Sequence, residues 1–218
     1  MSSRRKFLKK SIIIPSIIIL PRHVLGGKGY TSPSDKLNIA GIGVRKWGMG
    51  SGNLSNCETE NIVALCDVDH KLSAETFNKY PKAKVYKDFR VMLETQKDID
   101  AVIVATPDHT HAIISMMSIK LGKHVFCQKP LTHTVYEARV ITETARKYKV
   151  QTQMGNQGRS SEEIRRLKEW IDDGAIGPVR KVYAWTDRPV GGNPWDTFDA
   201  KAKPKEKPPI PKDLDWDL

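Results

Sequence analysis

A lysine at the end of a short apolar run is the residue of this sequence best suited to chemistry. The stretch HVFCQKPLTH, residues 124–133, places Gln128, Lys129 and Pro130 directly after apolar side chains. Strands buried on both faces of a sheet have this composition, and Lys129 would lie where such a strand ends. Its ammonium group is either a solvated end of the strand or a group that stabilises negative charge developing on a substrate oxygen.

A second polar stretch, ATPDHTHA, follows another apolar run and contains Thr106, Pro107, His109 and His111. A Thr-Pro turn at the carboxyl end of a parallel strand lies on the side where α/β proteins bind ligands. Two histidines two positions apart in a helix do not share a face, so paired metal ligation is not expected. Taken alone, His109 and His111 are interpreted as capping or surface residues.

Glycines gather around the end of the first apolar run, LNIAGIG. The cluster consists of Gly41, Gly43, Gly48 and Gly50. Glycines after a first strand would let backbone N–H groups approach a pyrophosphate at the start of a helix. The strict G-x-G-x-x-G pattern requires a glycine at position 46, where this chain has Lys46. A dinucleotide turn and an ordinary flexible loop are therefore both open at this point.

An acidic residue lies where the second apolar run ends. Asp67 follows Gly43 by 67 − 43 = 24 residues, about the distance at which a carboxylate accepts the ribose hydroxyls of NAD. A plain turn acid is the alternative, and Asp69 is an equally available candidate. An acid at this position disfavours the 2′-phosphate of NADP, whereas Arg45 and Lys46 would tolerate it. NAD is the expected cofactor, and NADP remains possible.

The hydrophobic pattern indicates how these residues are positioned. Near-continuous apolar runs at 37–43, 61–67, 100–106, 124–127 and 150–154 predict buried strands. Between them, residues 70–80, 88–96, 111–122 and 134–149 place apolar side chains three or four apart and predict helices. Strands that alternate with helices need crossover connections, so the sequence predicts an α/β protein with a doubly wound parallel Rossmann sheet.

Several motifs together resemble one known family. The glycine turn is followed by ALCDVD, YKDF, VATPDHTH, GKHVFCQKPLTHTVYEA and TQMGNQG. In this order and spacing they resemble the Gfo/Idh/MocA family of NAD(P)-dependent oxidoreductases, over residues 37–195. The resemblance implies an NAD(P)-binding Rossmann domain at 36–155 and then a second domain that holds a sugar, a cyclitol or a related polyol.

The resemblance also implies roles for individual residues. The Glu-Lys-Pro motif of the family falls on Gln128, Lys129 and Pro130, with Lys129 between the nicotinamide and the substrate. Gln128 keeps the hydrogen bonding of the usual glutamate but not its charge. Implied cofactor contacts are Gly41, Gly43, Gly48, Gly50, Asp67, Thr106, Pro107, His109, His111, Gln128, Lys129 and Pro130, and implied substrate contacts are Lys129 and Asn156.

Residues 156–218 resemble only the start of an α+β substrate domain. The stretch 156–177 predicts a helix with a capping box from Ser160 and Glu163, and 178–195 predicts a strand that runs into a loop. Relatives that oxidise alcohols take the proton with a histidine on the second domain, but this chain has no histidine after His133. Three hypotheses remain: a dehydrogenase of sugars or polyols, an NAD-dependent glycoside hydrolase, or a dinucleotide- or sugar-binding remnant without turnover.

The first 30 residues predict an export signal. The segment SRRKFLK resembles a twin-arginine motif, and the apolar segment after it, interrupted by Pro15, is too short to span a membrane. The alternative is a basic disordered tail beside an interfacial helix. We expect export to the periplasm through the twin-arginine machinery, with a membrane anchor if the signal is not cleaved.

Charge and cysteine content exclude other classes. The formal charge is +11, but six basic residues lie in the first 26, which leaves 11 − 6 = +5 for the remainder. That remainder forms no basic stripe, so no nucleic-acid partner is expected. Three widely spaced cysteines argue against both a disulfide framework and a zinc site. From the family resemblance, full-length relatives are expected to be homo-oligomers.

Overall fold

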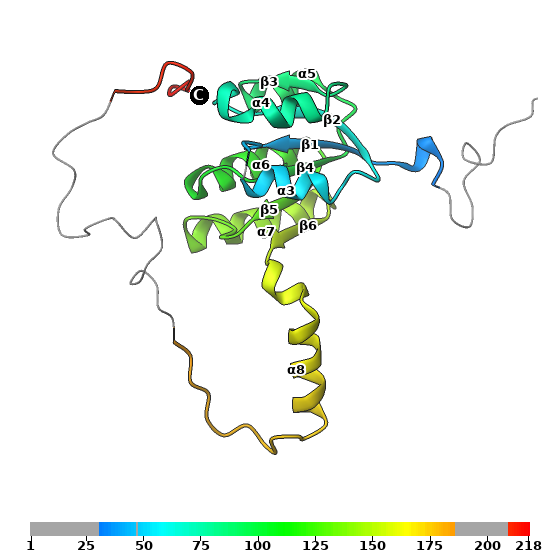
Figure 1. The fold of residues 1–218 in the computed structure, drawn as a ribbon, viewed down its shortest axis with the longest axis vertical. Coiled ribbons are helices and arrows are strands. Elements are labelled where there is room, and N and C mark those ends of the chain that lie inside the picture. The colour runs from blue at the N-terminus through cyan, green and yellow to red at the C-terminus, as the bar shows by residue number, and fades with distance from the viewer. Residues whose placement is uncertain (1–30, 47, 186–208) are drawn as a thin grey trace, which may run out of the picture. The chain divides into compact units, whose positions relative to one another are not determined.

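A six-stranded parallel sheet forms the centre of the protein in a computed structural model, which describes residues 31–46, 48–185 and 209–218 (Figure 1). The strands follow the order β3-β2-β1-β4-β5-β6, and each is parallel to its neighbours. Their bounds are β1 Asn38–Ile42, β2 Asn61–Cys66, β3 Lys84–Tyr86, β4 Ala101–Val104, β5 His124–Gln128 and β6 Thr152–Gly155. The predicted doubly wound Rossmann sheet is confirmed.

Helices connect successive strands, as parallel pairing requires. The α-helices are α3 Met49–Ser55, α4 His70–Lys79, α5 Phe89–Thr95, α6 His111–Lys120, α7 Val135–Tyr148 and α8 Glu162–Asp172. Short 3-10 helices are η1 Pro33–Asp35, η2 Asp108–Thr110 and η3 Gln157–Ser160. The chain divides into two compact units, Met1–Leu37 and Asn38–Leu218, and the described part of the first contains η1.

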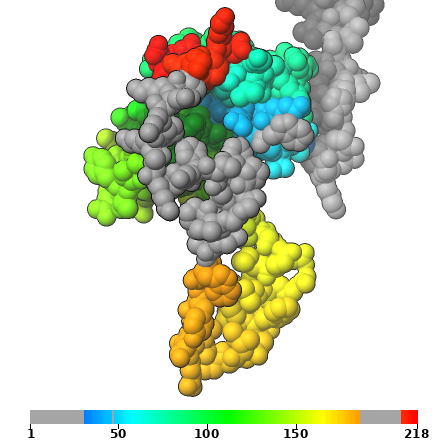
Figure 2. Space-filling view, turned by 60° about the vertical axis from the view of Figure 1, so that its left-hand side comes forward, coloured from blue at the N-terminus to red at the C-terminus, as the bar shows by residue number. Residues whose placement is uncertain are grey.

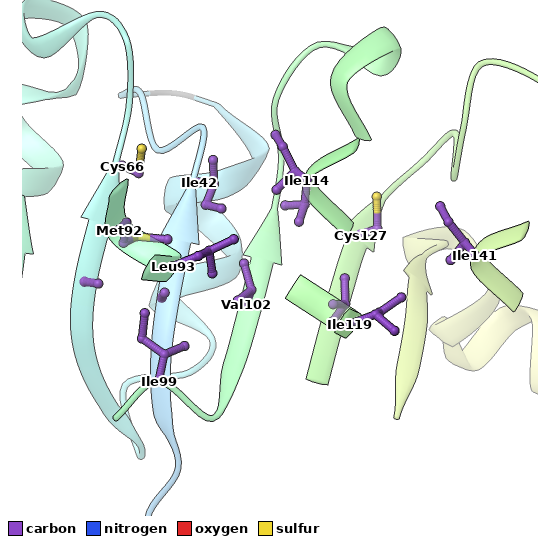
Figure 3. Close-up of a cluster of buried hydrophobic side chains, with 14 of the residues drawn as sticks. Ile42, Cys66, Met92, Leu93, Ile99, Val102, Ile114, Ile119, Cys127 and Ile141 are labelled. Atoms are coloured by element: carbon purple, nitrogen blue, oxygen red, sulfur yellow. The ribbon is translucent and has the colours of Figure 1, made fainter. Parts of the chain in front are cut away.

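The two faces of the sheet carry separate hydrophobic cores. On one face, Met92 and Leu93 of α5, Ile114 of α6 and Ile141 of α7 pack with strand side chains such as Val102 (Figure 3). On the other face, Leu54 of α3 packs with Ile39, Leu65 and Ile103. Neighbouring residues of β1 belong to different cores because successive side chains of a strand point to opposite faces. A doubly covered sheet follows, with its strand ends left for binding.

A capping box begins α7. The hydroxyl of Thr134 accepts a hydrogen bond from the backbone N–H of Glu137, and the Glu137 carboxylate accepts from the N–H of Thr134. Thr134→Ala is expected to lower the free energy of unfolding by about 1 kcal/mol because an N–H at the helix start loses its partner. Urea denaturation measures this, with the exposed mid-helix Thr142→Ala as the matched control. An equal loss in both variants would contradict the capping role.

The same cap has an expected pH dependence. Hydrogen bonds from the backbone N–H groups of Thr134 and His133, together with that threonine's side chain, lower the pKa of Glu137. A lowered folded pKa means that this stability is present above the unfolded pKa of about 4.3 and is lost as the pH falls through the folded value. Glu137→Gln should therefore remove part of the acid-induced loss of stability, measured by urea denaturation from pH 7 to pH 3.

Two details of the predicted α8 region are corrected. The N-cap of α8 is Ser161, whose hydroxyl accepts from the N–H of Ile164, whereas Ser160 belongs to η3. The helix ends before Gly174, which has a left-handed φ of 76° as a helix stop requires.

Residues 179–185, predicted as a strand, have no regular structure because no neighbouring strand in the described residues pairs with them. The rest of 178–195 lies outside the described residues.

Residues 209–218 contact the turn between β2 and α4 (Figure 2). The N–H of Asp215 donates to the carbonyl of Val68 at 3.1 Å, and Leu214 forms an antiparallel bridge with Asp69. Lys71 and Asp213 form an ion pair at 3.3 Å between exposed side chains. The backbone beside Asp67 therefore has partners from a distant part of the sequence.

The predicted export signal, residues 1–30, lies outside the described residues, so it stays a prediction. Within residues 31–46, 48–185 and 209–218, no helix combines the length and hydrophobicity needed to cross a membrane.

Candidate functional site

Two glycines let α3 begin directly against the end of β1. Gly43 has a left-handed φ of 79°, and a Cβ there would lie 2.6 Å from the carbonyl oxygen of Ala105. A Cβ on Gly50 would lie 2.0 Å from the carbonyl oxygen of Gly43. Both contacts are with backbone, which cannot move aside, so these positions require glycine. Close approach of helix and strand is the role that the third glycine of the dinucleotide pattern has.

The other two glycines of the cluster have different roles. Gly41 lies inside β1 rather than after it, and its missing side chain leaves room for Leu54 and Val44. Its direct approach to a pyrophosphate is therefore not supported, because its backbone takes part in strand pairing. Gly48 is the N-cap of α3 and provides no side-chain cap for the helix.

Lys46, in the loop after Gly43, contacts α4. The N–H of Lys46 donates to the carbonyl of Leu72 at 3.0 Å, and the ammonium group of Lys46 forms an ion pair with Glu75. Trp47 lies outside the described residues. Lys46 therefore has a backbone and a side-chain partner on α4.

Asp67 connects this loop to the end of β2. Its Oδ2 accepts a hydrogen bond from the N–H of Val44 at 2.8 Å, and its Oδ1 accepts from the N–H of Asp69 at 3.0 Å. Each carboxylate oxygen has a second lone pair that can accept a ribose hydroxyl. The competing candidate, Asp69, instead caps α4 by accepting from the N–H of Leu72. The structure therefore favours Asp67 for the ribose.

The turn after β4 contains the two predicted histidines. His109 is exposed in η2, consistent with a surface residue, but His111 is only 1% exposed. The ring of His111 forms hydrogen bonds to the carbonyls of Thr106, at 2.8 Å, and Pro130, at 2.7 Å. The interpretation of His111 as a capping or surface residue is wrong, because this first residue of α6 is buried between the turn after β4 and the turn after β5. Thr106 also accepts a hydrogen bond from Thr110 through its hydroxyl, at 2.7 Å.

The turn after β5 contains Lys129. Gln128 is 3% exposed, and its Oε1 accepts from the N–H of Lys129 at 3.2 Å and from Nε2 of Gln157 at 3.3 Å. Its own Nε2 is buried and has no hydrogen-bond partner among the described residues. Lys129 is exposed and precedes a cis peptide bond to Pro130.

Gly155, paired with Gln128 across β5 and β6, makes room for that amide. A Cβ on Gly155 would lie 2.9 Å from Nε2 of Gln128. Asn156 comes next in the chain and lies at the same edge of the sheet. Sequence reasoning missed Gln157 as a partner of Gln128, although the motif TQMGNQG contains it.

The site residues form a row along the carboxyl edge of the sheet. Asp67 follows β2, Gly43 follows β1, Thr106 and Pro107 follow β4, Lys129 and Pro130 follow β5, and Asn156 follows β6. Three strand spacings of about 4.8 Å separate β2 from β5, or about 14 Å in all. A ligand that reaches both Asp67 and Lys129 must be extended, as a dinucleotide is.

A cavity of about 310 Å³ lies between α3 and α4 and is lined in part by Gly48, one of the implied cofactor contacts. Its lining includes Lys46, Ser51, Glu75 and Lys79 but neither Lys129 nor Asp67. Among residues 31–46, 48–185 and 209–218, no group of three or more His, Cys, Asp and Glu residues is arranged to hold a metal ion.

The cysteines differ in expected reactivity. Burial raises the pKa of the Cys66 thiol to about 12 and that of Cys127 to about 11, whereas Cys57 is half-buried and its pKa is raised by burial and by Glu60. Since the thiolate is the reactive form, a thiol reagent at pH 8 should label Cys57 first and the other two only on unfolding. Mass spectrometry locates the label, and Cys57→Ser should remove the early phase. Early labelling of Cys127 would contradict this order.

A sequence model described as "Oxidoreductase family, NAD-binding Rossmann fold", Gfo/Idh/MocA, matches residues 37–156. The chain belongs to this family. The match covers the sheet and every residue of the row, so the Gfo/Idh/MocA resemblance noted in the motifs is confirmed.

Two similar relatives are named dehydrogenases. Inositol 2-dehydrogenase of Salmonella paratyphi B is 30% identical over 154 residues, which cover 68% of this chain and 44% of the relative. D-glucoside 3-dehydrogenase of Escherichia coli is 30% identical over 140 residues, 64% of this chain and 40% of the relative. The chain therefore spans less than half the length of these Gfo/Idh/MocA relatives.

A solved structure shows the same fold. The crystal structure of scyllo-inositol dehydrogenase from Lactobacillus casei with bound cofactor NAD(H) and scyllo-inositol has a TM-score of 0.59 and 23% identity. The similarity covers 65% of this chain and 42% of that chain. NAD is the cofactor of the matched Rossmann family, in agreement with the expected cofactor.

Proposed function

We propose that this protein transfers a hydride between NAD and a sugar, a cyclitol or a related polyol. The observation that carries the proposal is the row from Asp67 to Lys129 along one edge of the sheet. Relatives named inositol and glucoside dehydrogenases support the substrate class. Their names favour a dehydrogenase over the glycoside hydrolase and over the remnant without turnover.

In this proposal Asp67 holds the adenosine ribose and Lys129 acts on the substrate. When bound, NAD supplies the nicotinamide carbon that accepts the hydride. The ammonium group of Lys129 donates a hydrogen bond to the substrate oxygen and stabilises negative charge that develops on it, while the hydroxyl proton passes to solvent water. Asn156, which directly follows β6, donates to another substrate hydroxyl. Gln128 accepts from the N–H of Lys129 and so supports this turn without adding charge.

The experiment titrates NAD and NADP separately into the full chain by calorimetry, and then measures NADH formation with inositols and glucosides. We expect NAD to bind and Lys129→Met to retain binding while NADH formation is lost. No heat with millimolar NAD would overturn the function. Binding without NADH formation from any polyol would show that the proton acceptor is not on this chain, and would favour the remnant.

We propose that residues 1–30 direct export through the twin-arginine machinery. The support is the motif SRRKFLK before an apolar segment. Replacing Arg4 and Arg5 together with lysine should retain the protein in the cytoplasm, whereas Lys10→Arg should leave export unchanged. Fractionation with antibody detection measures the distribution, and a membrane-bound fraction of the unaltered protein would indicate an uncleaved anchor. Equal export of both variants would contradict the signal.

We propose that copies of the chain associate through the apolar side chains after α8. Val182, Tyr183 and Trp185 are 81%, 76% and 87% exposed and lie within four consecutive residues, so they present several apolar side chains together. Light scattering of the full chain should show a mass above that of one chain. Val182→Ser with Trp185→Ser should lower that mass, whereas Val135→Ser, on α7, should not. A monodisperse monomer would contradict association.

A further inference from the structure

His111 lies between two backbone carbonyls and is almost inaccessible to solvent. Nδ1 is 2.7 Å from the carbonyl oxygen of Pro130, and Nε2 is 2.8 Å from that of Thr106. Both distances are those of hydrogen bonds, and the side chain is 1% exposed. No water can replace either partner at that exposure, so the ring itself must satisfy both contacts.

The protonation of the ring follows from its partners. A carbonyl oxygen only accepts, so each ring nitrogen of His111 must donate. A neutral imidazole has one N–H, and its other nitrogen would then direct a lone pair at a carbonyl oxygen. The doubly protonated ring donates at both positions, and its two charge-assisted hydrogen bonds offset part of the cost of burying its charge.

The two carbonyls belong to two different turns of the site. Thr106 follows β4, and Pro130 is bonded directly to Lys129 after β5. We propose that His111, as a doubly protonated ring, is a positioning residue that joins these turns and sets the location of the Lys129 ammonium group along the cofactor row. This inference rests on the proposed function only for the role of Lys129; the bridge between the turns stands on geometry.

The first test is the protonation state of the ring in the full chain. Nitrogen-15 NMR at neutral pH should show both ring nitrogens of His111 carrying protons, and both protons should exchange slowly with solvent. Exposed His133 provides the comparison, since solvent reaches its ring and its ring protons should exchange rapidly. A neutral tautomer of His111, or rapid exchange of either proton, would overturn the bridge.

The second test uses variants that keep different numbers of donors. His111→Gln keeps N–H groups that can reach one carbonyl, whereas His111→Phe keeps none. We expect the dissociation constant of NAD to rise about tenfold in His111→Phe, less in His111→Gln, and not in the control His133→Gln. The NMR shift of the Lys129 amide should move in the same order. Equal constants in all three variants would overturn positioning by His111.

The two proposals fail in different ways. If the unaltered chain binds no NAD but both ring nitrogens of His111 are protonated, the proposed function fails and the bridge is supported. If NAD binds and the ring is neutral, the function is supported and the bridge fails. The NMR measurement requires only folded unaltered protein, so it decides the bridge even where His111→Phe does not fold.

Discussion

Gly50→Ala is expected to abolish NAD binding and to destabilise the protein by about 3 kcal/mol. The added methyl carbon would lie 2.0 Å from the carbonyl oxygen of Gly43, so α3 would have to move away from the end of β1. That movement would also displace Val44, whose N–H donates to Asp67. Urea denaturation and calorimetric titration with NAD measure the two effects.

The chain offers a matched control in the same helix. No atom lies within 4 Å of the position that a Cβ on Gly52 would take. Gly52→Ala should therefore leave NAD binding unchanged and raise the free energy of unfolding by about 0.5–1 kcal/mol, as alanine does in a helix interior. If Gly50→Ala and Gly52→Ala behaved alike, the close approach of α3 to β1 would not be what NAD binding requires.

Asp67→Asn is expected to raise the dissociation constant of NAD about a hundredfold. Two ribose hydroxyls would lose a charged acceptor, at about 1.5 kcal/mol each, and about 3 kcal/mol corresponds to that factor. The same change removes the charge that repels a 2′-phosphate, so the preference for NAD over NADP should fall. Calorimetric titration with both cofactors measures both effects.

Asp69→Asn is the matched control for Asp67. Asparagine caps a helix as well as aspartate does, so the hydrogen bond to the N–H of Leu72 is retained. NAD binding should change little in this variant. A larger loss in Asp69→Asn than in Asp67→Asn would assign the ribose to the other carboxylate.

Much of the fold was predictable because long apolar runs and helical periods repeat over many residues. The strands and helices from β1 to β6 were found in this way, except β3 and α3. That strand has only three residues, and two of them are exposed, so it lacks a hydrophobic pattern. The cap of α8 was misplaced by one residue because Ser160 and Ser161 are adjacent, and only the helix start distinguishes them.

The sequence was enough to predict that the site residues lie at the ends of neighbouring strands. It was not enough to predict which groups those residues contact. The types of Asp67, Thr106 and Lys129 and their places after strands suffice to assign them to one edge of a parallel sheet. The burial of His111 depends on two carbonyls, and backbone groups carry no sequence signal. Likewise, the function of Gly50 depends on its distance from Gly43, which the spacing of glycines does not give.

The contact between residues 213–215 and the turn after β2 can form only late during synthesis of the chain. All six strands have been translated by Gly155, but Val68 receives its backbone partner only from Asp215, which is translated 215 − 68 = 147 residues later. At about 5–20 residues per second, roughly 7 to 30 s separate the two events on the ribosome. The Asp67 end of the row thus acquires this neighbour only after the whole sheet has been translated.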